Sequence, residues 1–312
     1  MQEDLNNFFD MIDPSQTHIK GKLPFIWVFG AGAEHVKRID TITDKLNPGH
    51  SEFFLYDELS SNRAKFVQWC YLHYESNILV QSIRIPEQYP EWDSYRSKYT
   101  NLVDFELDII SISQGAIIFS ESIGSYVEIG MLSCLTELHQ NILIITPSEY
   151  IEDDCISFFN LGAISKIREN KLENTENIWG FENSLNNEKL SNEFKSISEH
   201  MLDIITTESK TIFSAAQKSH ISLLLLDLID LFPRNSKSFY KKALKNFGVE
   251  VEKTELDKIL SLLKILDLIK ERKSGNNEKL EVCTGSYFPC INYKGKNKTF
   301  DRRDFIIERS GK

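Results

Sequence analysis

Two short apolar runs separated by a helical stretch constrain the fold of this chain more than any other feature. Residues 116–119 and 142–145 contain no polar side chain, and residues 125–139 between them have the pattern of a helix. Strands without polar alternation are typical of parallel sheets that helices cover on both faces. Another apolar run, residues 25–29, ends in a glycine-rich turn. We therefore predict an α/β domain with a Rossmann-like or flavodoxin-like parallel sheet, in which ligands bind beyond the carboxyl ends of the strands.

The C-terminal third of the chain has a different pattern, with three amphipathic helical stretches followed by a hairpin signal. The hairpin is expected where strands 268–273 and 278–282 flank a Ser-Gly-Asn-Asn turn. Three helices and a hairpin are typical of a winged helix. The predicted organisation is an N-terminal arm (1–22), an α/β domain (23–170), a linker with a connecting helix (171–217) and a mainly helical winged-helix domain with a C-terminal tail (218–312).

Charge differs between the two halves. Residues 1–217 hold 16 Lys and Arg against 33 Asp and Glu, whereas residues 218–312 hold 20 against 13. A basic segment is a candidate for nucleic-acid binding. The third helix of the predicted winged helix carries mixed charge, which favours contacts to the phosphate backbone of a nucleic acid over contacts to its bases. A solvated surface or a protein-docking winged helix explains the same charge. The candidate nucleic-acid-binding residues are Lys241, Lys242, Lys245, Lys270, Arg272 and Lys273.

Several classes of protein are disfavoured by composition. No apolar run is long enough to span a membrane, and the acidic first residues differ from a secretion signal, so we expect a cytoplasmic protein. The five cysteines are scattered and never spaced as Cys-x-x-Cys, and no His-x-x-x-His pair is present. We therefore expect no disulfide framework, no metal and no cofactor.

The segment of greatest chemical interest joins the strand at 116–119 to the next helix. Its small residues let a sugar or phosphate approach the backbone, and it places Glu128 near the start of the helix. A carboxylate there can stabilise or attack the sugar carbon when an N-glycosidic bond breaks. The competing interpretation is a capping box, because Ser125-x-x-Glu128 also fits a helix start in which the glutamate bonds back to the backbone of Ser125. The two roles exclude each other.

This segment resembles the motif of the nucleoside deoxyribosyltransferases, in which a Glu-(Leu/Ile)-Gly sequence supplies the nucleophile. The resemblance is closer still to the deoxyribosyltransferase-like effectors of bacterial retrons, which carry a C-terminal winged helix. Ser157 to Gly162 and the glycine turn at residues 30–32 are similar to further segments of that branch. Two departures, Ile123 for a usual proline and Ile129 for a common leucine, keep the shape. The segment that carries the resemblance reads Glu121-Ser122-Ile123-Gly124-Ser125-Tyr126-Val127-Glu128-Ile129-Gly130.

The resemblance implies roles for particular residues. Glu128 would be the nucleophile, and Glu106, fifteen residues before Glu121, would be the second carboxylate that orients the nucleophile or handles the leaving base. For several of the others a structural role explains the residue as well: a tight turn for the glycines, strand capping for Asp57 and a turn for Asn160. The candidate substrate-binding residues are Gly30, Ala31, Gly32, Asp57, Glu121, Ser122, Gly124, Ser125 and Asn160.

The function implied is that of a retron anti-phage toxin. The resemblance implies cleavage of an N-glycosidic bond in NAD or a related nucleotide, and inhibition by the retron reverse transcriptase with its multicopy single-stranded DNA. A homo-oligomer or a larger assembly with these partners is expected. Two alternatives stay open: a nucleotide-sensing DNA-binding regulator without turnover, and a true deoxyribosyltransferase that exchanges bases.

Overall fold

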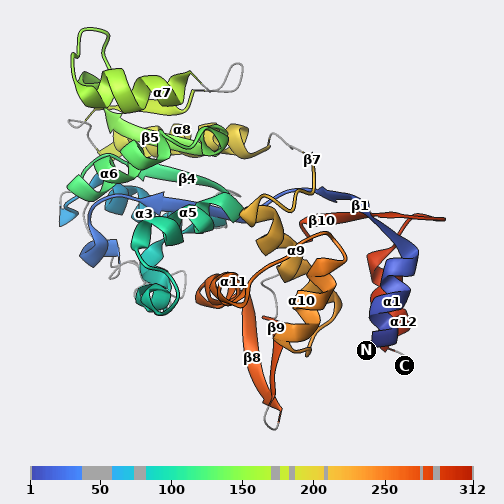
Figure 1. The fold of residues 1–312 in the computed structure, drawn as a ribbon. Coiled ribbons are helices and arrows are strands. Elements are labelled where there is room, and N and C mark those ends of the chain that lie inside the picture. The colour runs from blue at the N-terminus through green and yellow to red at the C-terminus, as the bar shows by residue number, and fades with distance from the viewer. Residues whose placement is uncertain are drawn as a thin grey trace. The chain divides into compact units, whose positions relative to one another are not determined.

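The structure is a computed structural model, and it describes residues 2–36, 58–73, 82–169, 176–182, 187–206, 210–274, 277–283 and 289–310. The chain divides into two compact units that alternate along the sequence (Figure 1). The α/β unit comprises Pro24–Pro90 and Ser113–Thr207. The terminal unit comprises Met1–Leu23, Glu91–Ile112 and Glu208–Lys312. The predicted domains are continuous in sequence, whereas both of these units are assembled from separate segments.

The α/β unit contains a sheet, the helices that cover it and several short helical turns. Its elements are β2 (Leu23–Phe29), α3 (Asn62–Leu72), β3 (Ile83–Arg84), η2 (Pro86–Gln88), β4 (Ser113–Phe119), α6 (Ile123–Leu132), η4 (Thr136–Asn141), β5 (Ile142–Pro147), η5 (Ser148–Tyr150), the π-helix η6 (Phe159–Ile164), α7 (Ser165–Arg168), β6 (Ile178–Phe181) and α8 (Asn187–Thr206).

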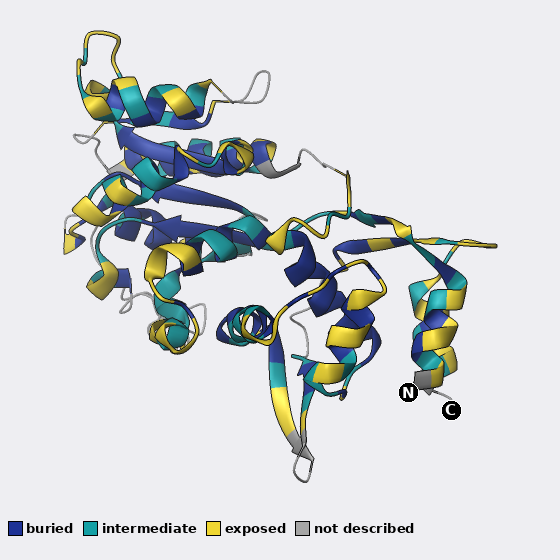
Figure 2. Ribbon diagram, in the orientation of Figure 1, coloured by how far each residue is buried: buried dark blue, intermediate teal, exposed yellow. Residues whose placement is uncertain are grey.

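In the part of the chain that the structure describes, the sheet has five strands in the order β3-β2-β4-β5-β6. Pairing is parallel between β2 and β3, between β4 and β5, and between β5 and β6, which confirms the predicted α/β class with a parallel sheet. Numbered within the sheet, the order is 2-1-3-4-5, which is the flavodoxin-like arrangement, and it reverses direction between β2 and β4. Figure 2 shows the inner strands β2, β4 and β5 of this sheet almost entirely buried. The apolar runs of the sequence are therefore its core.

Apolar side chains of α3 and α8 cover one face of the sheet. Phe66 on α3 packs against Phe119 of β4 and Phe194 of α8, with ring centroids 5.5 and 5.4 Å apart. Burial of such rings supplies most of the favourable free energy of a core of this kind. Strand β6 lies inside the stretch predicted as a linker, because its four residues are too few to give a periodic signal.

The terminal unit consists of the N-terminal segment, a middle segment with α5, and the C-terminal third of the chain. Its elements are α1 (Gln2–Met11), β1 (Ile12–Ile19), η3 (Trp92–Ser97), α5 (Leu102–Ile112), β7 (Thr211–Ile212), α9 (Lys218–Leu231), α10 (Lys237–Lys245), α11 (Lys253–Ile265), β8 (Ile269–Ser274), β9 (Asn277–Val282), β10 (Ile291–Gly295) and α12 (Arg302–Ser310). Helices α9, α10 and α11 and the antiparallel hairpin β8–β9 lie where the sequence predicts three helices and a hairpin.

The N-terminal segment, predicted as an arm, contributes helix α1 and strand β1 to the terminal unit. Strand β1 pairs with β10 and β7, and the ring of Phe8 packs edge-on against Phe232 and Tyr293. The buried carboxylate of Asp227 on α9 accepts hydrogen bonds from Tyr293 and Arg302, which fixes β10 and α12 to the helices. The first and last segments of the chain therefore complete the core of the terminal unit.

Candidate active site at the ends of β2 and β4

The candidate site lies at the carboxyl ends of β2 and β4, where the strand order of the sheet reverses. Ligands of doubly wound sheets bind at such a position, because the two following connections diverge to opposite faces. The glycine turn follows β2, and the segment from Ser120 to Glu128 follows β4. The structure thus brings together the two motifs that the sequence singles out.

Glu121, at the end of β4, is bonded to the start of helix α3. Its two carboxylate oxygens accept hydrogen bonds from the backbone amides of Asn62 and Arg63, at 2.6 and 3.1 Å. The first amides of a helix have no partner within the helix, and a carboxylate satisfies them well. Burial raises the pKa of Glu121, and the amide hydrogen bonds oppose this rise. Glu121, predicted to bind substrate, therefore has both oxygens engaged in holding β4 to α3.

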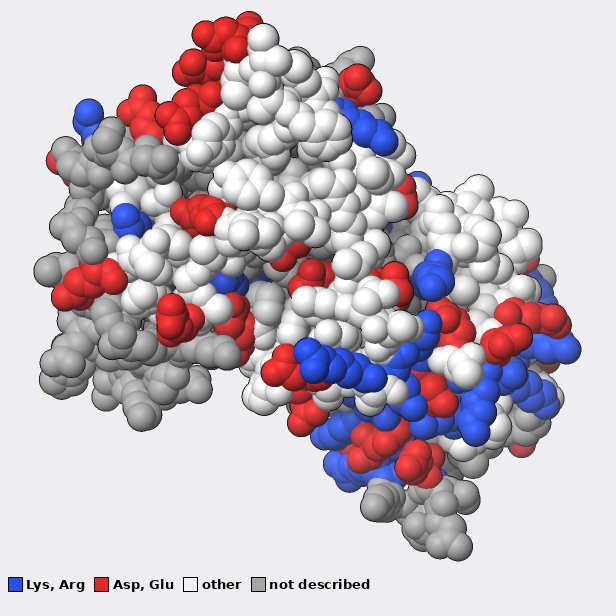
Figure 3. Space-filling view, turned by 60° about the vertical axis from the view of Figure 1, so that its left-hand side comes forward, with Lys and Arg blue, Asp and Glu red and all other residues white. Residues whose placement is uncertain are grey.

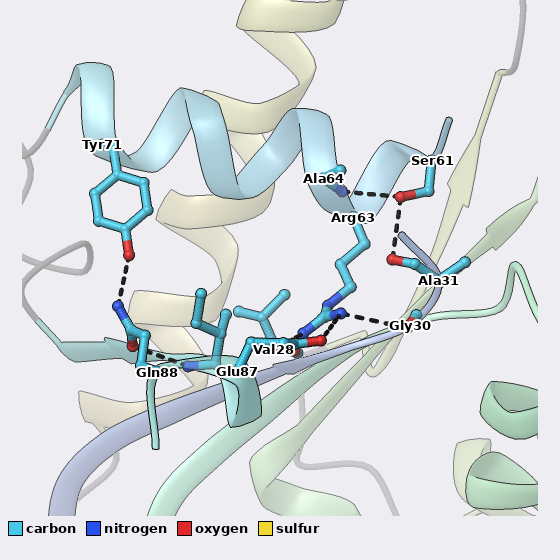
Figure 4. Close-up of polar contacts among 10 residues, drawn as sticks. Val28, Gly30, Ala31, Ser61, Arg63, Ala64, Tyr71, Glu87 and Gln88 are labelled. Atoms are coloured by element: carbon cyan, nitrogen blue, oxygen red, sulfur yellow. Dashed lines mark hydrogen bonds and ion pairs between the residues drawn. The ribbon is translucent and has the colours of Figure 1, made fainter. Parts of the chain in front are cut away.

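Arg63 is a buried cation at the centre of the site (Figure 4). Its guanidinium forms a two-bond ion pair with Glu87 of η2, at 2.8 and 2.7 Å. It also donates to the carbonyl oxygens of Val28 and Gly30 at the end of β2, at 3.1 and 3.4 Å. The arginine thus connects α3, η2 and the end of β2.

The glycine turn after β2 packs closely against its neighbours. Gly30 and Gly32 have positive φ angles of 142° and 84°. A Cβ atom on Gly30 would lie 3.0 Å from the Cβ of Phe119, and one on Gly32 would overlap the hydroxyl oxygen of Ser61. Both the backbone conformation and the lack of space require glycine here. The turn is also held by a 3.1 Å hydrogen bond from the Ser61 hydroxyl to the carbonyl oxygen of Ala31.

Helix α6 begins two residues earlier than predicted, and this decides the role of Glu128 at the helix start. Ser122 is the N-cap, and its hydroxyl accepts a hydrogen bond from the Ser125 amide at 3.1 Å. The Ser125 hydroxyl in turn accepts from the amides of Glu121 and Ser122, at 3.1 and 3.0 Å. The capping box is therefore Ser122 with Ser125. The alternative in which Glu128 caps the helix at Ser125 is wrong, because that amide is already bonded.

The Glu128 carboxylate is left without a structural partner on one of its oxygens. Among the described residues, its Oε2 atom is one of the few buried side-chain oxygens with no hydrogen bond. Burial raises the pKa of Glu128, and the positive charge of Arg63 opposes this rise. Glu128 is the sixth residue of α6, beyond the first turn, where the helix dipole has little effect. The ionised form is therefore favoured by Arg63 and not by the helix dipole.

The structure does not bring the other predicted site residues together with Glu128. Glu106 is buried on α5, which belongs to the terminal unit, whereas Glu128 belongs to the α/β unit. Its role as second carboxylate stays a prediction. Asp57 lies outside the described residues. Gly124 is exposed, and a Cβ there would meet no atom closer than 3.7 Å. Asn160 uses its side-chain amide to donate to the carbonyl oxygens of Glu152 and Cys155, which supports the turn-forming alternative.

Sequence reasoning missed Arg63 and Glu87. Both lie outside the motif, Arg63 on α3 and Glu87 on η2. The signal that could have pointed to Arg63 is its place on the apolar side of a helix whose neighbours Ala64, Phe66 and Val67 are buried. A charged residue in such a position is paired or functional.

The predicted nucleic-acid-binding residues lie on two elements of the terminal unit. Lys241, Lys242 and Lys245 are exposed on α10, and Lys270, Arg272 and Lys273 belong to β8; the Lys273 side chain is not described. The basic side chains of the hairpin are partly neutralised, because Lys270 and Arg272 both contact Glu281, at 3.4 and 2.5 Å. Arg234, which the sequence did not suggest, also binds Glu281, at 3.2 Å.

Comparison with known families identifies the chain. The sequence profile of the STM3845 retron effector protein matches residues 59–271, more than half of the chain. The protein belongs to this retron effector family. Membership indicates a role in retron anti-phage defence and an association with retron components. Comparison with curated proteins gives no match.

The match covers much of the candidate site, whereas β2 and the glycine turn after it lie before the matched residues. It includes α3 with Arg63, strand β4, and helix α6 with Glu128. It continues through α9, α10 and α11 into β8. Within the described residues, no helix of the effector is long and apolar enough to cross a membrane. In the same part of the chain, no three His, Cys, Asp or Glu side chains are grouped so as to hold a metal ion.

Proposed function

We propose that this retron effector is a toxin that cleaves the N-glycosidic bond of NAD or a related nucleotide, with Glu128 as the nucleophile. One observation supports the proposal above all: a buried glutamate oxygen without a hydrogen-bond partner, on the helix that starts at the switch point of the sheet. An unpaired buried carboxylate oxygen costs stability, and such costs are concentrated at functional sites. Ser122 and Ser125, which cap α6, leave the carboxylate free for chemistry.

The proposed reaction proceeds in two steps. Glu128 attacks the anomeric carbon of the sugar, an ester bond forms to its carboxylate oxygen, and the C–N bond breaks so that the base leaves with the electron pair. Water then attacks the same carbon, its hydroxyl group remains on the sugar, its second proton passes to solvent and the carboxylate is regenerated. Transfer to a free base in place of water would make the protein a deoxyribosyltransferase.

Burial prepares Glu128 for this reaction. A carboxylate removed from water attacks without first losing a hydration shell, provided that a nearby cation keeps it ionised. Arg63 supplies that charge, and Glu87 holds the guanidinium in place through two hydrogen bonds. Because the pKa of Glu128 is raised, we expect cleavage to be lost on acidification at a higher pH than an ordinary glutamate would give.

We further propose that the helices α9 to α11 and the hairpin form a winged helix that contacts the retron reverse transcriptase and its single-stranded DNA, and that this complex keeps the toxin inactive. The exposed lysines of α10 support contacts to phosphates. Association through such contacts weakens strongly between low and high salt. Binding that does not respond to salt would instead indicate docking to protein.

The test of the proposed activity compares three full-length proteins on NAD, nucleotides and nucleosides, with release of free base followed by chromatography. Wild type and Glu137→Gln, which changes an exposed glutamate of the same unit, are expected to release base at equal rates. Glu128→Gln is expected to be slower by about 10³-fold or more. Equal rates for wild type and Glu128→Gln would overturn the nucleophile assignment. Adding a free acceptor base separates hydrolysis from base exchange.

A further inference from the structure

A group of large apolar side chains is exposed on α6, the helix that carries Glu128, and on the segment that packs against it. Two lie one turn apart on α6, and three lie on the loop and π-helix after β5. One of the three, Phe158, belongs to the segment Ser157 to Gly162 that resembles other retron effectors, and it is the most exposed. The exposed fractions are 87% for Ile123, 61% for Val127, 88% for Ile156, 92% for Phe158 and 61% for Leu161.

These side chains are held on an ordered framework. The ring of Tyr126 on α6 packs edge-on against Phe159 of η6, with centroids 5.1 Å apart. Asn160 donates to the carbonyl oxygens of Glu152 and Cys155 and so folds the loop back onto η6. The apolar groups are therefore exposed by a fixed local structure. Large exposed apolar patches of this kind mark interaction sites on soluble proteins.

The same loop is strongly acidic. Between Ser148 and Gly162 there are four carboxylates and no lysine or arginine. Glu149, Glu152, Asp153 and Asp154 are all exposed, and none forms an ion pair with a described residue. Figure 3 shows acidic side chains grouped beside uncharged ones at the top of the view. We call these four acids and the five apolar residues the acidic–apolar surface.

Charge restricts what can bind to this surface. Nucleic acid is repelled, because its phosphates would approach four unpaired carboxylates. A second copy in a symmetric contact would bring the same carboxylates against each other. A protein segment that presents apolar side chains between lysines and arginines satisfies both features, since it buries the apolar groups and neutralises the acids.

We propose that the acidic–apolar surface is the docking site for a basic, amphipathic segment of the effector's protein partner in the retron. The proposal rests on the proposed function, in which the reverse transcriptase complex holds the toxin inactive. Val127, part of this surface, is adjacent to Glu128 on α6. A segment docked here therefore contacts the helix that positions the nucleophile, which gives the partner a direct means of control.

The test measures binding of the full-length effector to the purified reverse transcriptase of its own retron, without DNA. The double variant Phe158→Ser/Leu161→Ser removes two exposed side chains and is expected to fold normally but to bind at least about 10-fold more weakly. Glu152→Lys/Asp153→Lys is expected to weaken binding mainly at low salt. The control is Ile307→Ser, which changes an exposed apolar residue of α12 and is expected to bind as wild type does.

Three results would overturn the proposal. Equal binding of wild type and Phe158→Ser/Leu161→Ser would show that the partner docks elsewhere. Light scattering that finds a dimer of the effector alone, dissociated by this variant, would show that a second copy covers the surface. Failure of the wild type to bind the reverse transcriptase would remove this proposal and the proposed partner together, while base release by wild type against Glu128→Gln would still decide the proposed activity.

Discussion

The starts of helices α3 and α6 lie at the same edge of one sheet and differ in how their acidic groups are used. At α3, the Glu121 carboxylate binds two amides, the Ser61 hydroxyl accepts from the amide of Ala64, and Arg63 is paired with Glu87. At α6, two serines cap the helix, and the nearby Glu128 keeps a buried oxygen without a hydrogen bond.

Hydrogen bonding distinguishes an acid that stabilises the fold from one that is available to react, and the motif alone does not. Glu121 and Glu128 are seven residues apart in one pattern of small and acidic residues, and the motif places both of them in the candidate site. A buried group with every bond made contributes to stability, whereas one with a bond missing reduces it. The comparison predicts opposite effects on stability when each is replaced.

The largest effect on stability is expected from Arg63→Met. This change leaves the Glu87 carboxylate buried without its partner, and breaking a buried pair costs about 3–5 kcal/mol of unfolding free energy. Denaturant unfolding monitored by circular dichroism measures it. The double variant Arg63→Met/Glu87→Met removes both charges and should recover much of the loss. If the unfolding free energy of Arg63→Met lies within about 1 kcal/mol of the wild-type value, the ion pair is not needed at the start of α3.

A smaller loss is expected from Glu121→Ala. Two hydrogen bonds from the α3 amides to a charged acceptor are lost, at a cost of about 2 kcal/mol. The matched control is Glu137→Ala, at an exposed site of the same unit, which should change stability by less than about 0.5 kcal/mol. The folded Glu121→Ala protein is expected to retain base release. Loss of turnover without loss of stability would give Glu121 the substrate role that its bonds argue against.

The smallest effect, of opposite sign, is expected from Glu128→Gln. The raised pKa means that the folded protein binds this proton more tightly than the unfolded chain does, so wild-type stability falls as pH rises through the folded pKa. Glutamine does not ionise, so the variant does not lose this stability as pH rises. Glu128→Gln should therefore be more stable by about 1 kcal/mol at neutral pH, and the gain should vanish at pH values below the ordinary pKa of a glutamate. Denaturant unfolding at both pH values checks this, and destabilisation at neutral pH would contradict the comparison.

The sequence by itself determined the parallel sheet, the position of the motif after β4 and the three helices with a hairpin near the C-terminus. These are encoded locally, because apolar runs and helical periodicity depend on neighbours in the chain. The family resemblance also led from the same residues to the retron effectors, which the comparison with known families supports.

Only the tertiary structure decided which acid is free. Whether Glu128 capped its own helix depended on the N-cap, which is Ser122 and not Ser125. The role of Glu121 depended on amides 58 and 59 residues away in the sequence. The buried Arg63 and the assignment of α5 with Glu106 to the terminal unit are likewise set by distant contacts. Hydrogen-bond satisfaction is a property of packed groups, and local sequence patterns do not record it.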